Sequence, residues 1–138
     1  MYCVFCDIVS GAVPASIIYE DDLVAAFLDL FPVNRGHTLV IPKRHVIDLA
    51  SCSSDVAGEL FARAQALAPT IVEATGATGF NVWTANGPDA GQEIFHLHLH
   101  ILQRFTDDEF GLRFPKGYPR ETPRHELDEV ATTIRRQL

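Results

Sequence analysis

Three histidines alternate with apolar residues in the segment FHLHLHIL, residues 95–102. This period of two is typical of a β-strand with two unlike faces, so His96, His98 and His100 should project from one face at steps of about 6.6 Å. The apolar residues between them, from Phe95 onward, would enter a core on the other face. Imidazoles in such a row can ligate a metal or act as nucleophiles, and the spacing alone permits both chemistries.

A second group of reactive side chains opens the chain, where Cys3 and Cys6 form a C-x-x-C pair. Such a pair is a redox couple, half of a zinc site, or an accident of composition. A thioredoxin-like couple normally follows a strand in a βαβ pattern, which is absent here. Cys52 is the third cysteine, and the odd number favours a reducing cytoplasm over a secreted disulfide scaffold. We therefore expect a cytoplasmic protein.

Composition limits the partners. The 138 residues fit one domain, residues 1–138, and 47% hydrophobic content is enough for a core. The net charge of −7 argues against bulk nucleic-acid binding, although backbone N–H groups can still hold a small phosphate ligand. No apolar run approaches the ~18 residues of a membrane span, and the N-terminus lacks the pattern of a secretory signal. We expect neither nucleic acid nor a membrane as a partner.

The elements that must position these side chains follow from periodicity and turn residues. Short apolar runs between turn-forming residues predict strands at 16–19, 23–28, 37–41 and 80–85, in addition to the histidine segment. Apolar stripes at steps of three and four predict a long helix from 51–54 to Gly76, which Pro69 should kink or shorten, and a C-terminal helix after Thr122. A short helical turn should end at Gly11. The stripe residues are Val56, Leu60, Ala64, Leu67 and Ile71 in the long helix, and Leu127, Val130, Ile134 and Leu138 in the last one.

The histidine segment with its preceding Gly-Gln, GQEIFHLHLHIL at residues 91–102, resembles the signature of the histidine-triad (HIT) nucleotide hydrolases and transferases. The likeness extends to CxxC and IVxG near the N-terminus, to AFxD at residues 26–29, and to GHTLVIPKxH at residues 36–45. These pieces cover most of the core, residues 3–104, in the family's order. The C-terminal extension with its expected helix, residues 105–138, lies outside the match.

The resemblance implies an α+β fold, in which helices pack on an antiparallel sheet of about five strands, and a symmetric homodimer of the Hint-like type. It also implies hydrolysis or transfer of a nucleoside monophosphate group through a covalent nucleotidyl-histidine intermediate. The implied substrate is a purine nucleotide, either a nucleoside phosphoramidate or a dinucleotide polyphosphate, attacked at its α-phosphate. Fold analogy leaves the choice within this class open.

The resemblance also assigns roles by matching positions. His98 would attack the α-phosphorus, His100 would contact the phosphate, and His37 would support the site from a neighbouring strand. Gln92 would help to hold the phosphate oxygens. The substrate-binding positions are Asp29 for the ribose hydroxyls, Ile18 and Phe27 for the base, and Asn86, Gly91 and Glu93 for the phosphate region. The positions Cys3, Cys6, His45 and His96 match the ligands of zinc-bearing members, which implies a structural Cys₂His₂ zinc.

Glu93 departs from the family pattern, which often has Ser or Thr at this position. A carboxylate beside a phosphate is repelled unless it turns away, is protonated, or serves as an acid. Three functions therefore stay open: a nucleotidyl hydrolase or transferase, a nucleotide-binding regulatory module with little turnover, and a metalloenzyme whose three strand histidines hold a catalytic metal. We expect the first.

Overall fold

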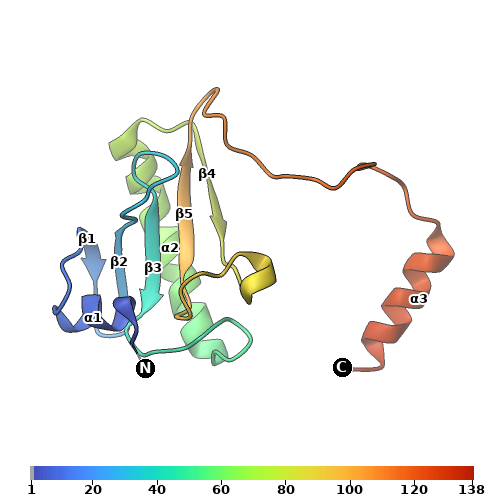
Figure 1. Ribbon diagram of the computed structural model, residues 1–138, viewed down its shortest axis with the longest axis horizontal. Helices are drawn as coiled ribbons and strands as arrows, with labels where there is room; N and C mark the ends of the chain where they lie inside the picture. Colours follow the sequence, from blue (N-terminus) through green and yellow to red (C-terminus); the bar gives the residue numbers. More distant parts are fainter. Residues whose placement is uncertain (1) are drawn as a thin grey trace.

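The computed structural model describes residues 2–138 and has an α+β fold built on one five-stranded sheet (Figure 1). In chain order the elements are α1 (Val4–Ser10), β1 (Ile17–Glu20), β2 (Val24–Leu28), β3 (Thr38–Pro42), α2 (Ser54–Thr75), β4 (Gly79–Trp83), a short 3₁₀ turn η1 (Pro88–Ala90), β5 (Leu99–Arg104) and α3 (Arg124–Arg135). The strand order is β1-β2-β3-β5-β4, and every neighbouring pair is antiparallel. The expected fold class is therefore confirmed.

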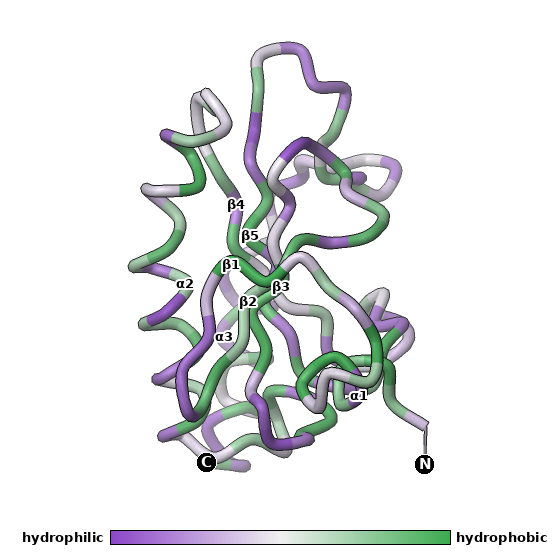
Figure 2. Tube along the Cα trace, turned by 90° about the vertical axis from the view of Figure 1, so that its left-hand side faces the viewer, coloured by the Kyte–Doolittle hydropathy of each residue, from purple (hydrophilic) through white to green (hydrophobic). Residues whose placement is uncertain are grey.

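The two faces of the sheet bury different helices. The stripe expected in α2 packs on one face, where Leu60, Ala64 and Ile71 join the buried residues Val40 and Leu99. On the other face α1 covers a second group of buried residues from β2 and β3. Hydrophobic residues accordingly run along the central strands (Figure 2). Helix α2 thus lies against β2, β3, β5 and β4, whereas α1 covers only part of the other face.

Helix α2 runs without interruption from Ser54 to Thr75 and contains Pro69. Of the two effects expected of Pro69, a kink or a shorter helix, the shortening was wrong. Pro69 is exposed, as is Gln65, whose carbonyl loses its intrahelical donor, while the neighbouring Ala68 is fully buried. Packing of the apolar stripe therefore holds the helix together across the missing hydrogen bond.

The histidine segment is a regular strand only in its second half, because β5 begins at Leu99. Residues 94–96 form a bend, and residues 97–98 lie outside the strand: the Leu97 N–H donates to the carbonyl of Val46 at 2.6 Å. Leu97 and Leu99 are buried as expected, whereas Phe95 is 48% exposed. The expectation that Phe95 enters the core was wrong, because the period of two does not extend back to it.

The C-terminal extension leaves the sheet after β5 and ends in α3, which stands away from the rest of the chain (Figure 1). The predicted helix is present. Within α3 the stripe is exposed, from 41% at Leu127 to 59% at Val130, and the last expected stripe residue, Leu138, lies beyond the end of the helix and is fully exposed. Among the described residues, no helix is long and apolar enough to cross a membrane.

Candidate active site

The central strands bring three histidines together on the face opposite α2. His100 lies directly across from Leu39 of β3 and from Trp83 of β4, and such opposed residues share a face of the sheet. His37 precedes β3, and its Nε2 lies 2.9 Å from His100 Nδ1. The rings of His98 and His100 are 4.9 Å apart between centroids. The three histidines therefore come from two neighbouring strand segments, the start of β3 and the start of β5, that are distant in sequence.

Hydrogen bonds assign the proton on two of these rings. The Val33 N–H donates to His37 Nδ1 at 3.2 Å, so His37 carries its proton on Nε2. His37 Nε2 then donates to His100 Nδ1. His100 must in turn carry its proton on Nε2. The relay leaves His100 as a neutral ring whose Nε2–H can donate to a ligand.

The backbone orients His98. Its Nδ1–H donates to the carbonyl of His96 at 2.6 Å, which leaves the lone pair on Nε2. The residue is 7% exposed. A backbone carbonyl thus holds the Nδ1 proton, and His98 Nε2 has the electronic state that a nucleophile needs.

Burial keeps the three rings neutral. Desolvation is the main cause that lowers the pKa of His37, His98 and His100, and the nearby Asp29 carboxylate opposes it in each case. The pKa of His100 falls to about 4 because His98 and His37 add to the effect of burial. All three imidazoles are therefore uncharged at neutral pH.

Asp29 lies at the end of β2 beside His37. Its Oδ1 accepts the Phe31 N–H at 2.9 Å, and its Oδ2 lies 3.7 Å from His37 Nδ1. The backbone N–H of Asp29 also donates to the His37 carbonyl at 2.9 Å. The Asp29 side chain is 20% exposed, so a carboxylate edge remains at the surface next to the histidines.

The loop between β2 and β3 requires glycine at position 36. Gly36 has φ +87°, and a Cβ there would come within 2.6 Å of Thr75 Cγ2 at the end of α2. Only a residue without a side chain allows this approach. The contact brings the loop against α2 and so sets the position of His37.

Gln92 is buried and uses its amide within the protein. Its Oε1 accepts the Gly87 N–H at 2.8 Å, and its Nε2 donates to the carbonyls of Ile47 and Ile94. These bonds shape the loop before the histidine segment. If the Gln92 side chain contacts a phosphate as expected, at least one of these hydrogen bonds must break and be replaced by a bond to the phosphate.

Three other residues expected near the phosphate differ in their environments. The Asn86 Oδ1 accepts the Leu49 N–H at 2.8 Å and so ties two loops together. Gly91 has φ +86° and ends η1, with open space where a Cβ would stand. Glu93 is exposed, and its side chain makes no ion pair with any residue in the described range 2–138.

The residues expected to hold a base lie beside α1. Phe27 is 3% exposed, and its ring meets that of Phe5 edge-on at 5.5 Å. The pairing of β1 with β2 is irregular between Ile17 and Tyr19, which places Ile17 opposite Phe27. Ile18, the residue expected here, lies within this irregularity and is 42% exposed. The structure therefore aligns Ile17, rather than Ile18, with Phe27.

The four residues expected to hold zinc converge. All ligand atoms of Cys3, Cys6, His45 and His96 lie within 4.8 Å of one another. His96 Nδ1 is 3.4 Å from Cys3 Sγ and 3.6 Å from Cys6 Sγ. A tetrahedral zinc with ordinary Zn–S and Zn–N lengths separates such atoms by about 3.6 Å. His96 Nε2 donates to the Pro42 carbonyl at 2.8 Å, which turns the Nδ1 lone pair toward the thiols. The donor set fits a tetrahedral metal.

The three histidines of the strand do not form a metal site with one another. Among residues 2–138, the other set of converging ligand atoms is Asp29, His37 and His100, and it includes neither His96 nor His98. His96 points instead to the two thiols. This arrangement argues against a catalytic metal held by His96, His98 and His100.

Sequence reasoning missed two aromatic residues of the site. Phe5 lies between the two cysteines in sequence and meets the rings of His96 and His98 edge-on at 5.8 and 5.3 Å. Trp83 stacks on His100, with centroids 5.3 Å apart. The signal for Phe5 was its place between two candidate ligands. The signal for Trp83 was the pairing of its strand, β4, with the histidine strand β5.

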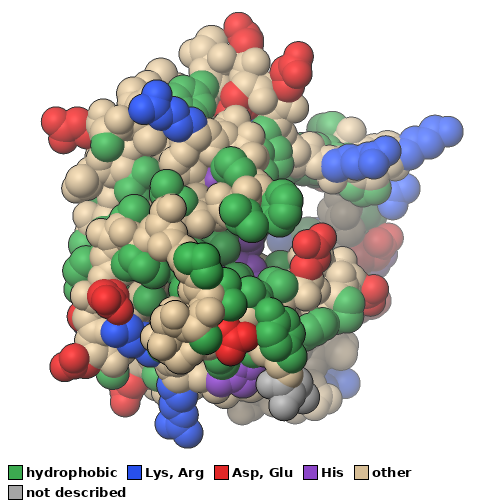
Figure 3. All heavy atoms as spheres, turned by 60° about the vertical axis from the view of Figure 1, so that its left-hand side comes forward, with side chains coloured by type: hydrophobic (Ala, Val, Ile, Leu, Met, Phe, Trp, Pro, Cys, Tyr) green, Lys and Arg blue, Asp and Glu red, His purple; other side chains and the backbone are tan. Residues whose placement is uncertain are grey.

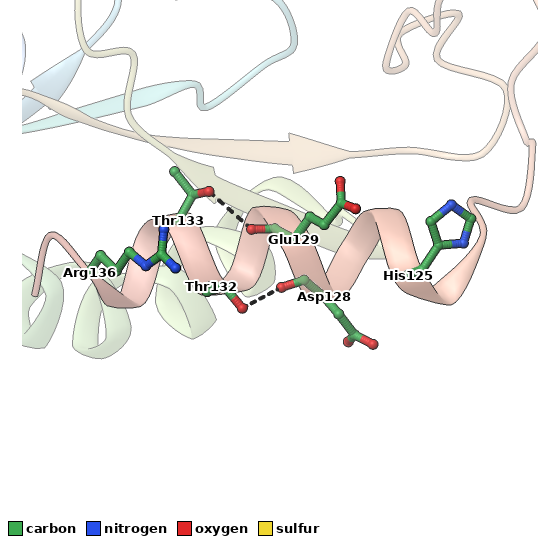
Figure 4. A pocket seen from close by; sticks show the side chains of 6 residues that line it. All are labelled: His125, Asp128, Glu129, Thr132, Thr133 and Arg136. Atoms are coloured by element: carbon green, nitrogen blue, oxygen red, sulfur yellow. Dashed lines mark hydrogen bonds between the residues drawn. The ribbon is translucent and has the colours of Figure 1, made fainter.

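Histidine side chains lie at the bottom of a hollow rimmed by hydrophobic side chains (Figure 3). A different hollow lies on α3, lined by five residues of that helix and by Arg136, which follows it: the five are His125, Asp128, Glu129, Thr132 and Thr133 (Figure 4). The hydroxyls of Thr132 and Thr133 donate to carbonyls of the same helix. A single helix cannot enclose a ligand, so the α3 hollow is no part of the site.

Comparisons with known proteins agree with the resemblance seen in the sequence motifs. A HIT domain model matches residues 10–107. The "Protein hit" of Bacillus subtilis is 35% identical over 99% of this chain and 94% of its own length. The "Adenylylsulfatase HINT3" of Arabidopsis thaliana is 41% identical over 77% of this chain, which spans 54% of that protein.

Solved structures are similar to this chain over nearly its whole length. A Streptococcus mutans protein superposes with a TM-score of 0.92 at 41% identity, covering 98% of this chain and 84% of that one. A hypothetical histidine triad nucleotide-binding protein from Sulfolobus tokodaii has a TM-score of 0.74 at 34% identity, with 97% and 90% covered. A zinc-bound histidine triad family protein from Mycobacterium smegmatis has a TM-score of 0.77 at 37% identity, with 96% and 98% covered.

Proposed function

The chain belongs to the HIT domain family, and from that premise we propose that it is a hydrolase or transferase acting at the α-phosphate of a nucleotide. The substrate class comprises nucleoside phosphoramidates, dinucleoside polyphosphates and, from the name of the Arabidopsis relative, adenylyl sulfate. The observation that carries the proposal is the state of His98, a buried neutral imidazole with its proton held by the His96 carbonyl and its lone pair on Nε2.

The reaction proceeds in two displacements. His98 Nε2 attacks the α-phosphorus, a P–N bond forms, and the bond from phosphorus to the leaving group breaks, with the leaving group taking a proton from solvent. The positive charge that develops on the ring is stabilised by the Nδ1–H bond to the His96 carbonyl. Water then attacks the phosphorus and releases a proton to solvent, the P–N bond breaks, and the lone pair returns to His98 Nε2.

Neighbouring groups bind and orient the substrate in this scheme. His100 donates its Nε2–H to a non-bridging phosphate oxygen, and His37 holds His100 in that tautomer. The exposed edge of Asp29 accepts the ribose hydroxyls. The base lies against the aromatic and aliphatic side chains around Phe27 and Ile17.

Zinc in the Cys₂His₂ cluster would be structural, because four protein ligands leave no open position on the metal. Its role would be to fix α1 against the start of the histidine segment. The distances between sulfur and nitrogen atoms support this proposal, as does the zinc-bound relative from Mycobacterium smegmatis.

The proposed assembly is a symmetric homodimer in which α3 contacts a second copy. Residues 105–138 are about a quarter of the chain, so a TM-score of 0.92 requires the Streptococcus mutans protein to hold most of its extension in the same outward position. A helix with an exposed apolar stripe needs a covering surface. A second copy of the chain can supply this covering surface, because it is present in every solution of the protein.

A regulatory nucleotide-binding module with little turnover is the second candidate, and Glu93 is the observation that favours it. One assay separates the two functions: purified protein is incubated with adenosine phosphoramidate, adenylyl sulfate and a diadenosine polyphosphate in parallel, and nucleotide products are quantified. We expect many turnovers on at least one substrate. Nucleotide binding without product from any of the three would reject the enzymatic proposal and leave the module.

A further inference from the structure

Four planar groups stand in a row from the histidine cluster to the C-terminal extension. Trp83 stacks on His100 with centroids 5.3 Å apart and planes at 24°. Phe110 stacks on Trp83 at 5.8 Å and 8°. The guanidinium of Arg104 lies 5.1 Å from the centre of the Phe110 ring. The Trp83 ring thus stacks on both His100 and Phe110.

We propose that Trp83 and Phe110 are positioning residues for His100, so that the first turn of the C-terminal extension, residues 105–110, belongs to the active site. Neither residue touches the reacting atoms. Each acts through its neighbour: Phe110 holds Trp83, and Trp83 holds the plane of the His100 ring. The kinetic part of this proposal rests on the proposed function, whereas its structural part does not.

Trp83 is fixed to its place by the sheet. It is the residue of β4 that pairs directly with His100 on β5, so the two side chains rise side by side from one face. The other edge of His100 is held by the hydrogen bond from His37 Nε2. A ring bonded at one nitrogen can still swing about its axis, and a flat partner against its face opposes that swing.

Phe110 is fixed by a tightly bonded turn. Asp108 accepts hydrogen bonds from Arg104, from Asn34 and from the backbone N–H groups of Phe105 and Phe110. The Asp108 side chain is 7% exposed. These bonds turn the chain back immediately after β5 and deliver the Phe110 ring onto Trp83.

The backbone of this turn supports the same conclusion. Asp107 and Glu109 have φ of 60° and 57°, a region that residues other than glycine rarely occupy. Such conformations persist where the surrounding contacts impose them, and they gather at functional sites. Here Asp108, between the two, supplies the contacts. The turn is therefore built to place Phe110, rather than being a loose start of the extension.

The test uses the full chain and the variants Phe110→Ala, Asp108→Ala, Trp83→Ala and Trp83→Phe. Phe114→Ala is the matched control, because Phe114 lies further along the same extension and stacks on Tyr118. The first readout is the tautomer of His100 at pH 7.5, measured by long-range ¹H–¹⁵N correlation spectroscopy. The second is acrylamide quenching of Trp83, the single tryptophan of the chain. The third is the steady-state kcat and KM on the best substrate.

We expect wild type, Trp83→Phe and Phe114→Ala to keep one His100 tautomer, protonated on Nε2. Phe110→Ala, Asp108→Ala and Trp83→Ala should show mixed tautomers and a kcat lower by about tenfold to a hundredfold, with KM changed by less than about threefold. Phe110→Ala should also increase the quenching of Trp83.

A folded Phe110→Ala protein with an unchanged His100 tautomer and unchanged kcat would overturn the proposal, and so would a Phe114→Ala protein as impaired as Phe110→Ala. Phe110 lies on a surface turn, so Phe110→Ala tests the positioning role even if Trp83→Ala does not fold. Absence of turnover in the wild type would reject the proposed function alone, because the spectroscopic readouts remain.

Discussion

Phe5 should couple the metal-binding end of the chain to the nucleophile, and replacing it tests that coupling. It is the one buried residue of α1 and is 6% exposed. Its ring meets Phe27, His96 and His98 edge-on. Helix α1 has seven residues and no side-chain cap at its N-terminus, so it cannot persist without this packing.

The size of the effect follows from burial. Truncating a buried phenylalanine to alanine usually costs about 3–5 kcal/mol, and we expect about 3 kcal/mol for Phe5→Ala because α1 can detach locally instead of leaving a closed cavity. Phe5→Leu keeps most of the apolar area but loses the edge-on ring contacts, which predicts a loss of about 1–1.5 kcal/mol. Phe61→Ala is the control: this α2 residue is 45% exposed and should cost about 1 kcal/mol or less.

The assay is urea unfolding in excess zinc and again in the presence of a chelator, with zinc content measured for each variant. We expect Phe5→Ala to lose stability mainly in the presence of zinc and to bind the metal more weakly. A Phe5→Ala protein within about 1 kcal/mol of wild type, or as destabilised as Phe61→Ala, would refute the role given to this residue.

Three further predictions concern pH, metal and assembly. Because burial lowers the pKa of His98 and the neutral ring is the nucleophile, turnover should stay constant as the pH falls below 6.5 and decline only at lower pH; a decline centred at or above 6.5 would contradict this. Protein purified without added metal should contain about one zinc per chain, and its removal should lower the midpoint of thermal unfolding; equal heat stability without metal would reject the structural zinc. Light scattering should give a dimer of 15.3 kDa chains, and Ile134→Glu on the exposed stripe of α3 should shift it toward monomer; a monomeric wild type at micromolar concentration would rule the dimer out.

Local patterns were enough to predict most of the fold. The stripe from Val56 to Ile71 identified the face of α2 that packs on the sheet, because an amphipathic helix has few other ways to bury its apolar residues. The alternation of histidines identified the face that carries His98 and His100. The same rule failed at Phe95, since the segment before β5 does not keep the strand conformation on which the rule depends.

The parts of the site that escaped prediction depend on contacts between distant segments. Trp83 and Phe110 are separated by the whole histidine strand in sequence, and only the pairing of β4 with β5 and the turn at Asp108 bring them together. The alignment of Ile17 with Phe27 depends on an irregularity in strand pairing, which residue types do not specify. Likewise, Gln92 looked like a ligand-binding residue, and its three internal hydrogen bonds are visible only in the folded chain.

The proposed mechanism depends on a covalent bond between His98 and the phosphorus of the nucleotide. The most direct measurement is mass spectrometry of protein that has been mixed with substrate, quenched within the first turnover and digested under conditions that preserve the P–N bond. We expect a nucleoside monophosphoryl group on the peptide that contains His98, and its absence from a folded His98→Ala protein. That variant should lose at least about 10³ in turnover while nucleotide affinity falls far less. Turnover near the wild-type rate in His98→Ala, or the added mass on another residue, would contradict the role of His98 as the nucleophile.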